Sequence, residues 1–86
     1  METTVYLTVK DEKNANIWSE FQYFKPLEHI TNNSLASMFF EAKNYAEWKP
    51  STYDASYRFY NWNSKQYDTF KATILVKKNN VVFIWR

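Results

Sequence analysis

Apolar and polar residues alternate without a break along residues 3–10. Three aliphatic residues fall on one side of an extended chain and three hydroxyl-bearing residues on the other: Val5, Leu7 and Val9 against Thr4, Tyr6 and Thr8. A period of two residues is typical of a strand that has one buried and one wet face. The pattern predicts a β-strand from Thr3 to Lys10.

The next segment, residues 16–25, fits two different periods. Ile17, Phe21 and Phe24 recur at helical spacing, which favours a short helix. The same stretch also alternates between large apolar and polar residues, which favours a strand. The pattern leaves this choice open, and Pro26 ends whichever element forms.

The clearest helical period runs from Ser34 to about Trp48. Apolar residues recur three or four positions apart along one side of this segment: Leu35, Met38, Phe39, Ala42 and Tyr45 or Ala46. Asn33 or Ser34 is in position to cap the first turn, and Lys49-Pro50 ends the pattern. A helix with one apolar face is expected to pack that face against another element.

From Ser56 onward the period returns to two and predicts three strands, at residues 56–62, 66–77 and 81–86. The first sets Tyr57 and Phe59 against Arg58 and Tyr60, and the second sets Phe70, Ala72, Ile74 and Val76 against Thr69, Lys71, Thr73 and Leu75. Asn79-Asn80 is expected to form the last turn, because Asn tolerates the left-handed conformation that a type I′ hairpin requires.

The predicted order is one strand, one main helix and then three strands. This order indicates an α+β fold with a four-stranded, mainly antiparallel sheet (β-α-β-β-β) and the helix packed on one face. With 86 residues, the chain has the usual size of one domain, so residues 1–86 are expected to form a single domain. The last strand is expected to lie at an edge of the sheet, where it would be available for a homodimer.

Composition excludes several kinds of chemistry. The chain has no Cys and no Gly, which excludes disulfides, thiolate zinc sites and glycine-rich phosphate loops. His29 is the single histidine, and the carboxylates are scattered, so we expect neither catalytic residues nor a metal or cofactor site. No apolar run is long enough for a membrane span or placed as in a signal peptide, which predicts a cytoplasmic protein with no membrane partner.

The choice of polar residues is also informative. Asn occurs nine times, and without Gly it is expected to fill the left-handed turn positions. The chain is also rich in Lys, Phe, Tyr and Ile, which like Asn have A/T-rich codons. The composition therefore indicates an A/T-rich genome, and many bacteriophages and mobile elements have such genomes.

Aromatic residues make up 21% of the chain, more than a small core is expected to enclose. The rings left over are expected to form a contact surface, because Tyr, Trp and Arg are enriched in binding hot spots. The residues predicted to contact a partner are Tyr57, Arg58, Tyr60, Trp62, Lys65, Lys71 and Trp85.

Three functions remain after these exclusions. The leading hypothesis is a small non-enzymatic protein-binding module, with which a phage or mobile element would bind and block a host protein. The alternative is a single-stranded nucleic-acid binder that uses basic and aromatic side chains on the sheet. Asp54 and Asp68 dilute that basic patch, and the net charge is only +2. The third is a toxin-like endoribonuclease, whose candidate residues are His29, Arg58, Tyr60, Lys65 and Arg86.

Overall fold

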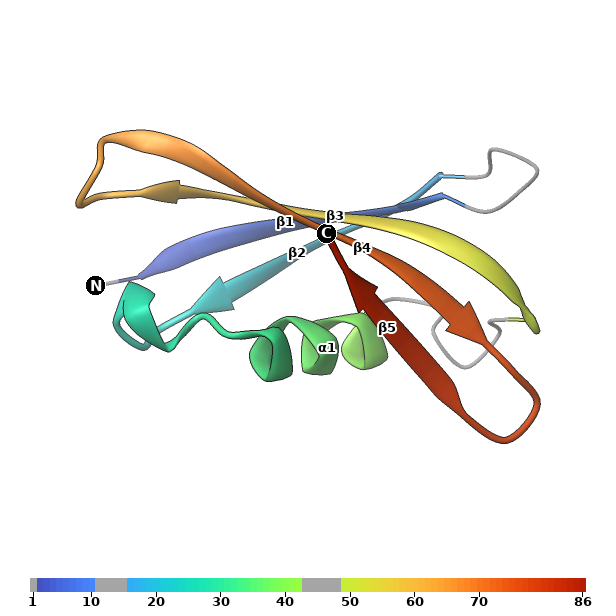
Figure 1. The fold of residues 1–86 in the computed structure, drawn as a ribbon. Coiled ribbons are helices and arrows are strands. Elements are labelled where there is room, and N and C mark those ends of the chain that lie inside the picture. Colours follow the sequence, from blue (N-terminus) through green and yellow to red (C-terminus); the bar gives the residue numbers. More distant parts are fainter. Residues whose placement is uncertain (1, 11–15, 43–48) are drawn as a thin grey trace.

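The computed structural model describes residues 2–10, 16–42 and 49–86 (Figure 1). Its elements are β1 (Thr3–Lys10), β2 (Asn16–Tyr23), a 3₁₀ turn η1 (Leu27–His29), α1 (Asn32–Glu41), β3 (Ser51–Asn61), β4 (Gln66–Val76) and β5 (Val81–Trp85). All described strands belong to one antiparallel sheet with the order β2-β1-β3-β4-β5. The predicted α+β class, antiparallel sheet and helix are confirmed, but the prediction of four strands was wrong, because the sheet has five.

The fifth strand is β2, the segment whose sequence fitted both periods. It pairs with β1 along its whole length, from Asn16 opposite Lys10 to Tyr23 opposite Thr3. This register puts Phe21 opposite Val5, on the face that the helix covers. Pairing with β1 therefore favours a strand over a helix for this segment. The pattern of the segment alone does not contain that information.

Helix α1 begins earlier than expected. Its N-cap is Thr31, whose side chain accepts a hydrogen bond from the Ser34 backbone N–H, while Ser34 Oγ accepts one from the Thr31 backbone N–H. The predicted caps, Asn33 and Ser34, were wrong because this reciprocal capping box satisfies two backbone donors at once. The helix ends at Glu41, since Ala42 is extended, and the rest of the predicted helix, residues 43–48, lies outside the described residues.

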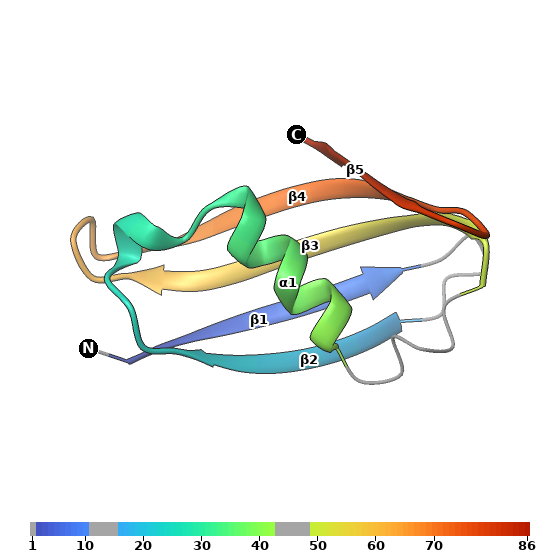
Figure 2. The ribbon, with the colours of Figure 1, turned by 90° about the horizontal axis from the view of Figure 1, so that it is seen from below.

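The helix lies on one face of the sheet and runs diagonally across the strands (Figure 2). Its buried residues Leu35, Met38 and Phe39 join the inward-facing side chains of the strands in one core. The strand residues of that core include Val5, Leu7, Val9, Tyr53, Ala55, Tyr57, Phe59, Ala72 and Ile74. Every second residue of β1 and β3 thus faces the helix, as the period of two predicts.

The turns differ from the predicted ones. Lys65, in the β3–β4 turn, has a φ of 59° and is the single non-glycine residue with positive φ in the described part of the chain. Asn was expected at such a left-handed position, but Asn61 stabilises the turn in another way. Its side-chain oxygen accepts hydrogen bonds from the backbone N–H groups of Asn63 and Ser64. The type I′ turn predicted at Asn79-Asn80 was wrong: neither residue is left-handed, and β4 and β5 are joined by the four-residue loop 77–80.

Within the described segments, no helix has both the length and the apolar character needed to cross a lipid bilayer.

Candidate functional site

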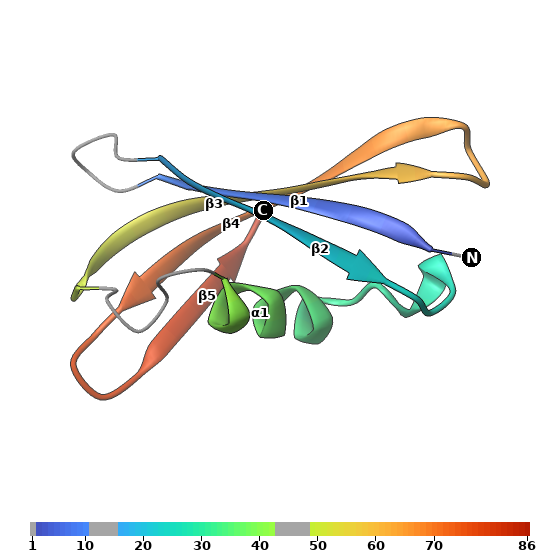
Figure 3. The same cartoon turned by 180° about the vertical axis from the view of Figure 1, so that it is seen from behind.

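The face of the sheet opposite α1 is not covered by any helix of the described residues. Figure 1 and Figure 3 view the molecule from opposite sides, and both place α1 below the sheet with nothing helical above it. We call this the open face. Strand register assigns to it Thr4, Tyr6, Thr8 and Lys10 of β1, Glu20 and Gln22 of β2, Asp54, Ser56, Arg58 and Tyr60 of β3, and Tyr67, Thr69, Lys71 and Thr73 of β4.

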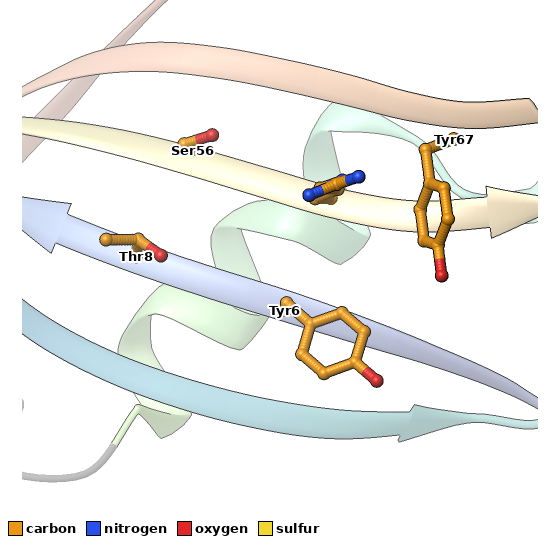
Figure 4. Close-up of a pocket in the computed structure, with 5 residues that line it drawn as sticks. Tyr6, Thr8, Ser56 and Tyr67 are labelled. Carbon is orange, nitrogen blue, oxygen red and sulfur yellow. The ribbon is translucent and has the colours of Figure 1, made fainter.

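A hollow of about 370 Å³ lies at the centre of the open face, lined by Tyr6, Thr8, Ser56, Arg58 and Tyr67 (Figure 4). The short side chains of Thr8 and Ser56 are cross-strand neighbours and form its floor. The guanidinium carbon of Arg58 lies 4.3 Å from the centre of the Tyr67 ring, which is cation–π geometry. This contact with Tyr67 orients the Arg58 side chain at the rim of the hollow.

One end of this hollow is aromatic. The rings of Tyr60 and Tyr67 meet edge to face with centroids 5.3 Å apart, and those of Tyr60 and Trp62 do so at 4.9 Å. Tyr67 is 53% exposed and Trp62 is 50% exposed, so the cluster offers ring surface to a ligand. We call Tyr60, Trp62 and Tyr67 the aromatic end, and a second hollow that also includes Tyr6 and Glu2 runs along it.

The other end is cationic. A third hollow there is lined by Thr8, Lys10, Asp54, Ala55, Ser56, Lys71 and Arg86. Arg86 Nη2 donates to Asp54 Oδ1 at 3.0 Å, whereas Lys10 and Lys71 make no ion pair with any described carboxylate. We call Lys10, Lys71 and Arg86 the cationic end. Adjoining hollows share lining residues, so the three lie next to one another along the open face, and we call them together the trough.

Two aspartates that weakened the basic patch in the sequence do not act against it here. Asp54 is compensated by Arg86, as just described. Asp68 pairs with Phe59 in the register, so it belongs to the opposite face, where it accepts a hydrogen bond from Asn61 Nδ2 at 2.8 Å. Among the residues that the structure describes, the other carboxylates along the trough are Glu2, at the aromatic end, and Glu20, on β2 beside Tyr6.

Four of the seven predicted contact residues come together on this surface: Arg58, Tyr60, Trp62 and Lys71. Lys65 is exposed in the β3–β4 turn, beyond the aromatic end. Tyr6, Tyr67 and Lys10 also line the trough but were not among the predicted contact residues. Alternation in β1 places Tyr6 and Lys10 on the wet side, and alternation in β4 places Tyr67 on the same face as Thr69.

The other two predicted contact residues face the helix instead. Tyr57 is fully buried, and its hydroxyl group has no hydrogen-bond partner among the described residues. Burial also raises the pKa of Tyr57 well above its usual range, because ionisation would place a charge in the core. Trp85 is partly buried on the same face and stacks on Phe83 with centroids 5.6 Å apart. Both rings therefore belong to the core rather than to the trough.

The residues considered for ribonuclease chemistry are not gathered in one place. Arg58 and Tyr60 lie on the open face, whereas His29 is exposed at the end of η1, which follows β2 on the helix side. None of the hollows along the trough is lined by His29. In the part of the chain that the structure describes, no three His, Asp or Glu residues are grouped closely enough to hold a metal ion.

Comparison with protein-family models, with curated proteins and with solved structures found no match to this chain.

Proposed function

We propose that the protein binds single-stranded nucleic acid along the trough of its open face. The observation that supports this is the order of side chains in the trough: clustered rings at one end, Arg58 in the middle and the cationic end beyond it. Single-strand binders combine a positively charged groove for phosphates with aromatic side chains on which bases stack. The adjacent hollows of the trough supply both kinds of side chain on one face of the sheet.

The dimensions favour a short stretch of strand. Tyr6 and Lys10 are four residues apart in β1, which corresponds to about 13 Å at the rise of a β-strand. A nucleotide whose base stacks on the aromatic end would thus have the next phosphates within reach of Arg58 and Lys71. The exposed ring surface of Tyr67 and Trp62 is what an unstacked base requires.

A single strand fits this surface better than a duplex does. The major groove of B-DNA admits a helix or a two-stranded ribbon. The rings and cations of the trough lie instead on the broad face of a five-stranded sheet, and α1 is on the opposite side. Bases held in a duplex would not reach the rings, so duplex competitor is expected to bind weakly.

The first test is a salt titration of binding to a labelled single-stranded oligonucleotide, followed by fluorescence anisotropy. Lys71→Ala is expected to weaken binding and to reduce the slope of log K against log salt by about 0.7, the value for one phosphate contact. Lys77→Ala is the matched control, because Lys77 is exposed in the β4–β5 loop, away from the trough. Equal losses in the two variants, or no binding at low salt, would contradict the proposal.

The second arm of the test concerns stacking. Tyr67→Ala is expected to weaken binding by on the order of tenfold, since stacking of one base contributes about 1–3 kcal/mol by alanine substitution. Phe24→Ala is the control: Phe24 is 70% exposed but follows β2 and lines none of the trough. Unchanged affinity for Tyr67→Ala would remove the aromatic end from the interface.

Protein binding is the second candidate, and the inhibitor role that the composition favours stays a prediction. A further hollow of about 270 Å³ beside Trp62 supports it, lined by Thr3, Lys25, Pro26, Leu27, Glu28, Trp62 and Asn63. An exposed Trp next to apolar side chains is a frequent anchor in protein interfaces. If no oligonucleotide binds at low salt, this candidate takes precedence.

A further inference from the structure

The two edges of the sheet differ in chemistry. The β2 edge carries polar residues along its length, including Ser19, Glu20 and Gln22. The β5 edge consists of five apolar residues, Val81–Trp85, of which Val82 is 37% and Ile84 is 49% exposed. Natural edge strands are usually protected from pairing by charges, prolines or bulges, and β5 contains no charged residue and no proline.

The backbone of β5 shows which of its hydrogen-bonding groups face outward. Arg86 N donates to Lys71 O at 2.9 Å, and Lys77 N donates to Asn80 O at 2.8 Å, at the two ends of the β4–β5 ladder. Residues of an antiparallel strand alternate between bonding to one side and to the other. Val82 and Ile84 therefore bond to β4, and the N–H and C=O groups of Val81, Phe83 and Trp85 point away from the sheet.

We propose that β5 pairs with β5 of a second copy of this chain, antiparallel and centred on Phe83. In that register Phe83 lies opposite Phe83 of the second copy, and Val81 lies opposite Trp85. All three residues are the ones with outward backbone groups, so each opposed pair exchanges two hydrogen bonds. The same strand thus supplies both halves of a two-fold, isologous contact.

Side chains fit this register on both faces. On the open face, Val82 lies opposite Ile84 of the second copy, and the contact covers two of the most exposed aliphatic side chains of the described residues. On the helix side, Phe83 and Trp85 extend the aromatic cluster with Phe40, which is 43% exposed. Arg86 lies opposite Asn80 of the second copy, so no like charges face each other.

The pairing also has a geometric consequence. The two-fold axis is perpendicular to the sheet, so both open faces lie on the same side of one continuous ten-stranded sheet. Each copy keeps its own trough, since none of the residues that line it belongs to β5. The dimer therefore does not depend on the nucleic-acid proposal and is tested without any ligand.

Sedimentation equilibrium over a range of concentrations up to millimolar tests the dimer directly. The average mass is expected to rise from the 10.5 kDa of one chain toward twice that value. Val81→Pro removes an outward N–H at the first residue of the strand, and Ile84→Lys places a charge in the contact, so each is expected to weaken dimerisation at least tenfold. Thr52→Lys adds the same charge to the open face on β3, outside the contact, and is expected to leave dimerisation unchanged.

Hydrogen exchange of the β5 amides provides the second measurement. In the dimer, the amides of Val81, Phe83 and Trp85 are expected to become protected as concentration rises, whereas those of Val82 and Ile84 are protected at all concentrations. A monomer mass at millimolar concentration would overturn the proposal. So would a dimer that neither β5 variant weakens, or one in which the outward amides of β5 still exchange freely.

Discussion

Neighbouring residues of one strand have opposite roles in this protein. In β3, Tyr57 is fully buried beneath α1, while the next residue, Arg58, is exposed on the open face above Tyr67. The covered face is closely packed from β1 to β4. The open face instead has short side chains, Thr8 and Ser56, between long ones, and this difference in length creates the trough. Alternate residues of β3 thus belong to the core and to the proposed binding surface.

Because the covered face is packed and the open face is not, substitutions on the two faces are expected to differ most in their effect on stability. Leu7→Ala is expected to lower the free energy of unfolding by about 2–5 kcal/mol, because Leu7 is fully buried and its removal leaves a cavity. Thr8→Val, the next position and on the open face, is expected to change that free energy by no more than about 0.5 kcal/mol. Urea denaturation of both variants measures the difference.

Equal effects of these two substitutions would break the comparison. A large loss for Thr8→Val would mean that the open face is packed against something in solution, so the trough would not be available to a ligand. A small loss for Leu7→Ala would mean that the core relaxes around the cavity, and the covered face would then be less closely packed than its burial indicates.

The division of the strands into a buried and an exposed face is largely predictable from the alternation of apolar and polar residues. Because side chains of a strand point to opposite faces in turn, the sequence correctly separates Val5 and Leu7 from Tyr6, and Phe59 from Arg58. Alternation does not say which face a helix will cover. Tyr57 and Trp85 were predicted at a contact surface, although alternation already sets Tyr57 on the face opposite to Arg58, and the structure places both rings on the helix side.

The remaining differences arise from contacts between distant segments. Residues 16–23 become a strand because β1 pairs with them, and the charge of Asp54 is compensated by Arg86, 32 positions later in the chain. The place of Thr31 as the cap follows from its reciprocal bonds with Ser34, which a preference for Asn or Ser does not reveal. Each of these outcomes is decided by pairing partners rather than by local preference.

The buried hydroxyl of Tyr57 gives a smaller and opposite effect on stability. Tyr57→Phe is expected to raise the free energy of unfolding by about 1 kcal/mol, because it removes a buried polar atom for which the described part of the chain offers no hydrogen-bond partner. A decrease in stability would show that the hydroxyl is satisfied in solution, for example by a buried water. Urea denaturation near neutral pH is the measurement.

The same residue predicts a dependence on alkaline pH. Burial raises the pKa of Tyr57 in the folded protein, so the unfolded chain loses this proton first. The contribution of the neutral phenol to stability is complete below the unfolded pKa of about 10 and falls as pH rises above it. Tyr57→Phe is expected to make the unfolding free energy less sensitive to pH in this range, and an unchanged slope would contradict this.

The smallest expected effect on stability concerns the ion pair on the open face. Asp54 and Arg86 are 67% and 51% exposed, so Asp54→Asn is expected to change the free energy of unfolding by less than about 1 kcal/mol. Its effect on oligonucleotide binding is expected to be clearer: the variant removes a carboxylate from the cationic end and releases Arg86 for a phosphate. Tighter binding and a salt slope steeper by up to about 0.7 are the expected results.

Asp68→Asn separates this local effect from a general change in charge. It removes the same single negative charge, but Asp68 lies on the other face beside Asn61. If binding uses the trough, Asp54→Asn strengthens it and Asp68→Asn changes it little. If both variants strengthen binding equally, the oligonucleotide senses only net charge, and the two faces of the sheet do not differ in recognition.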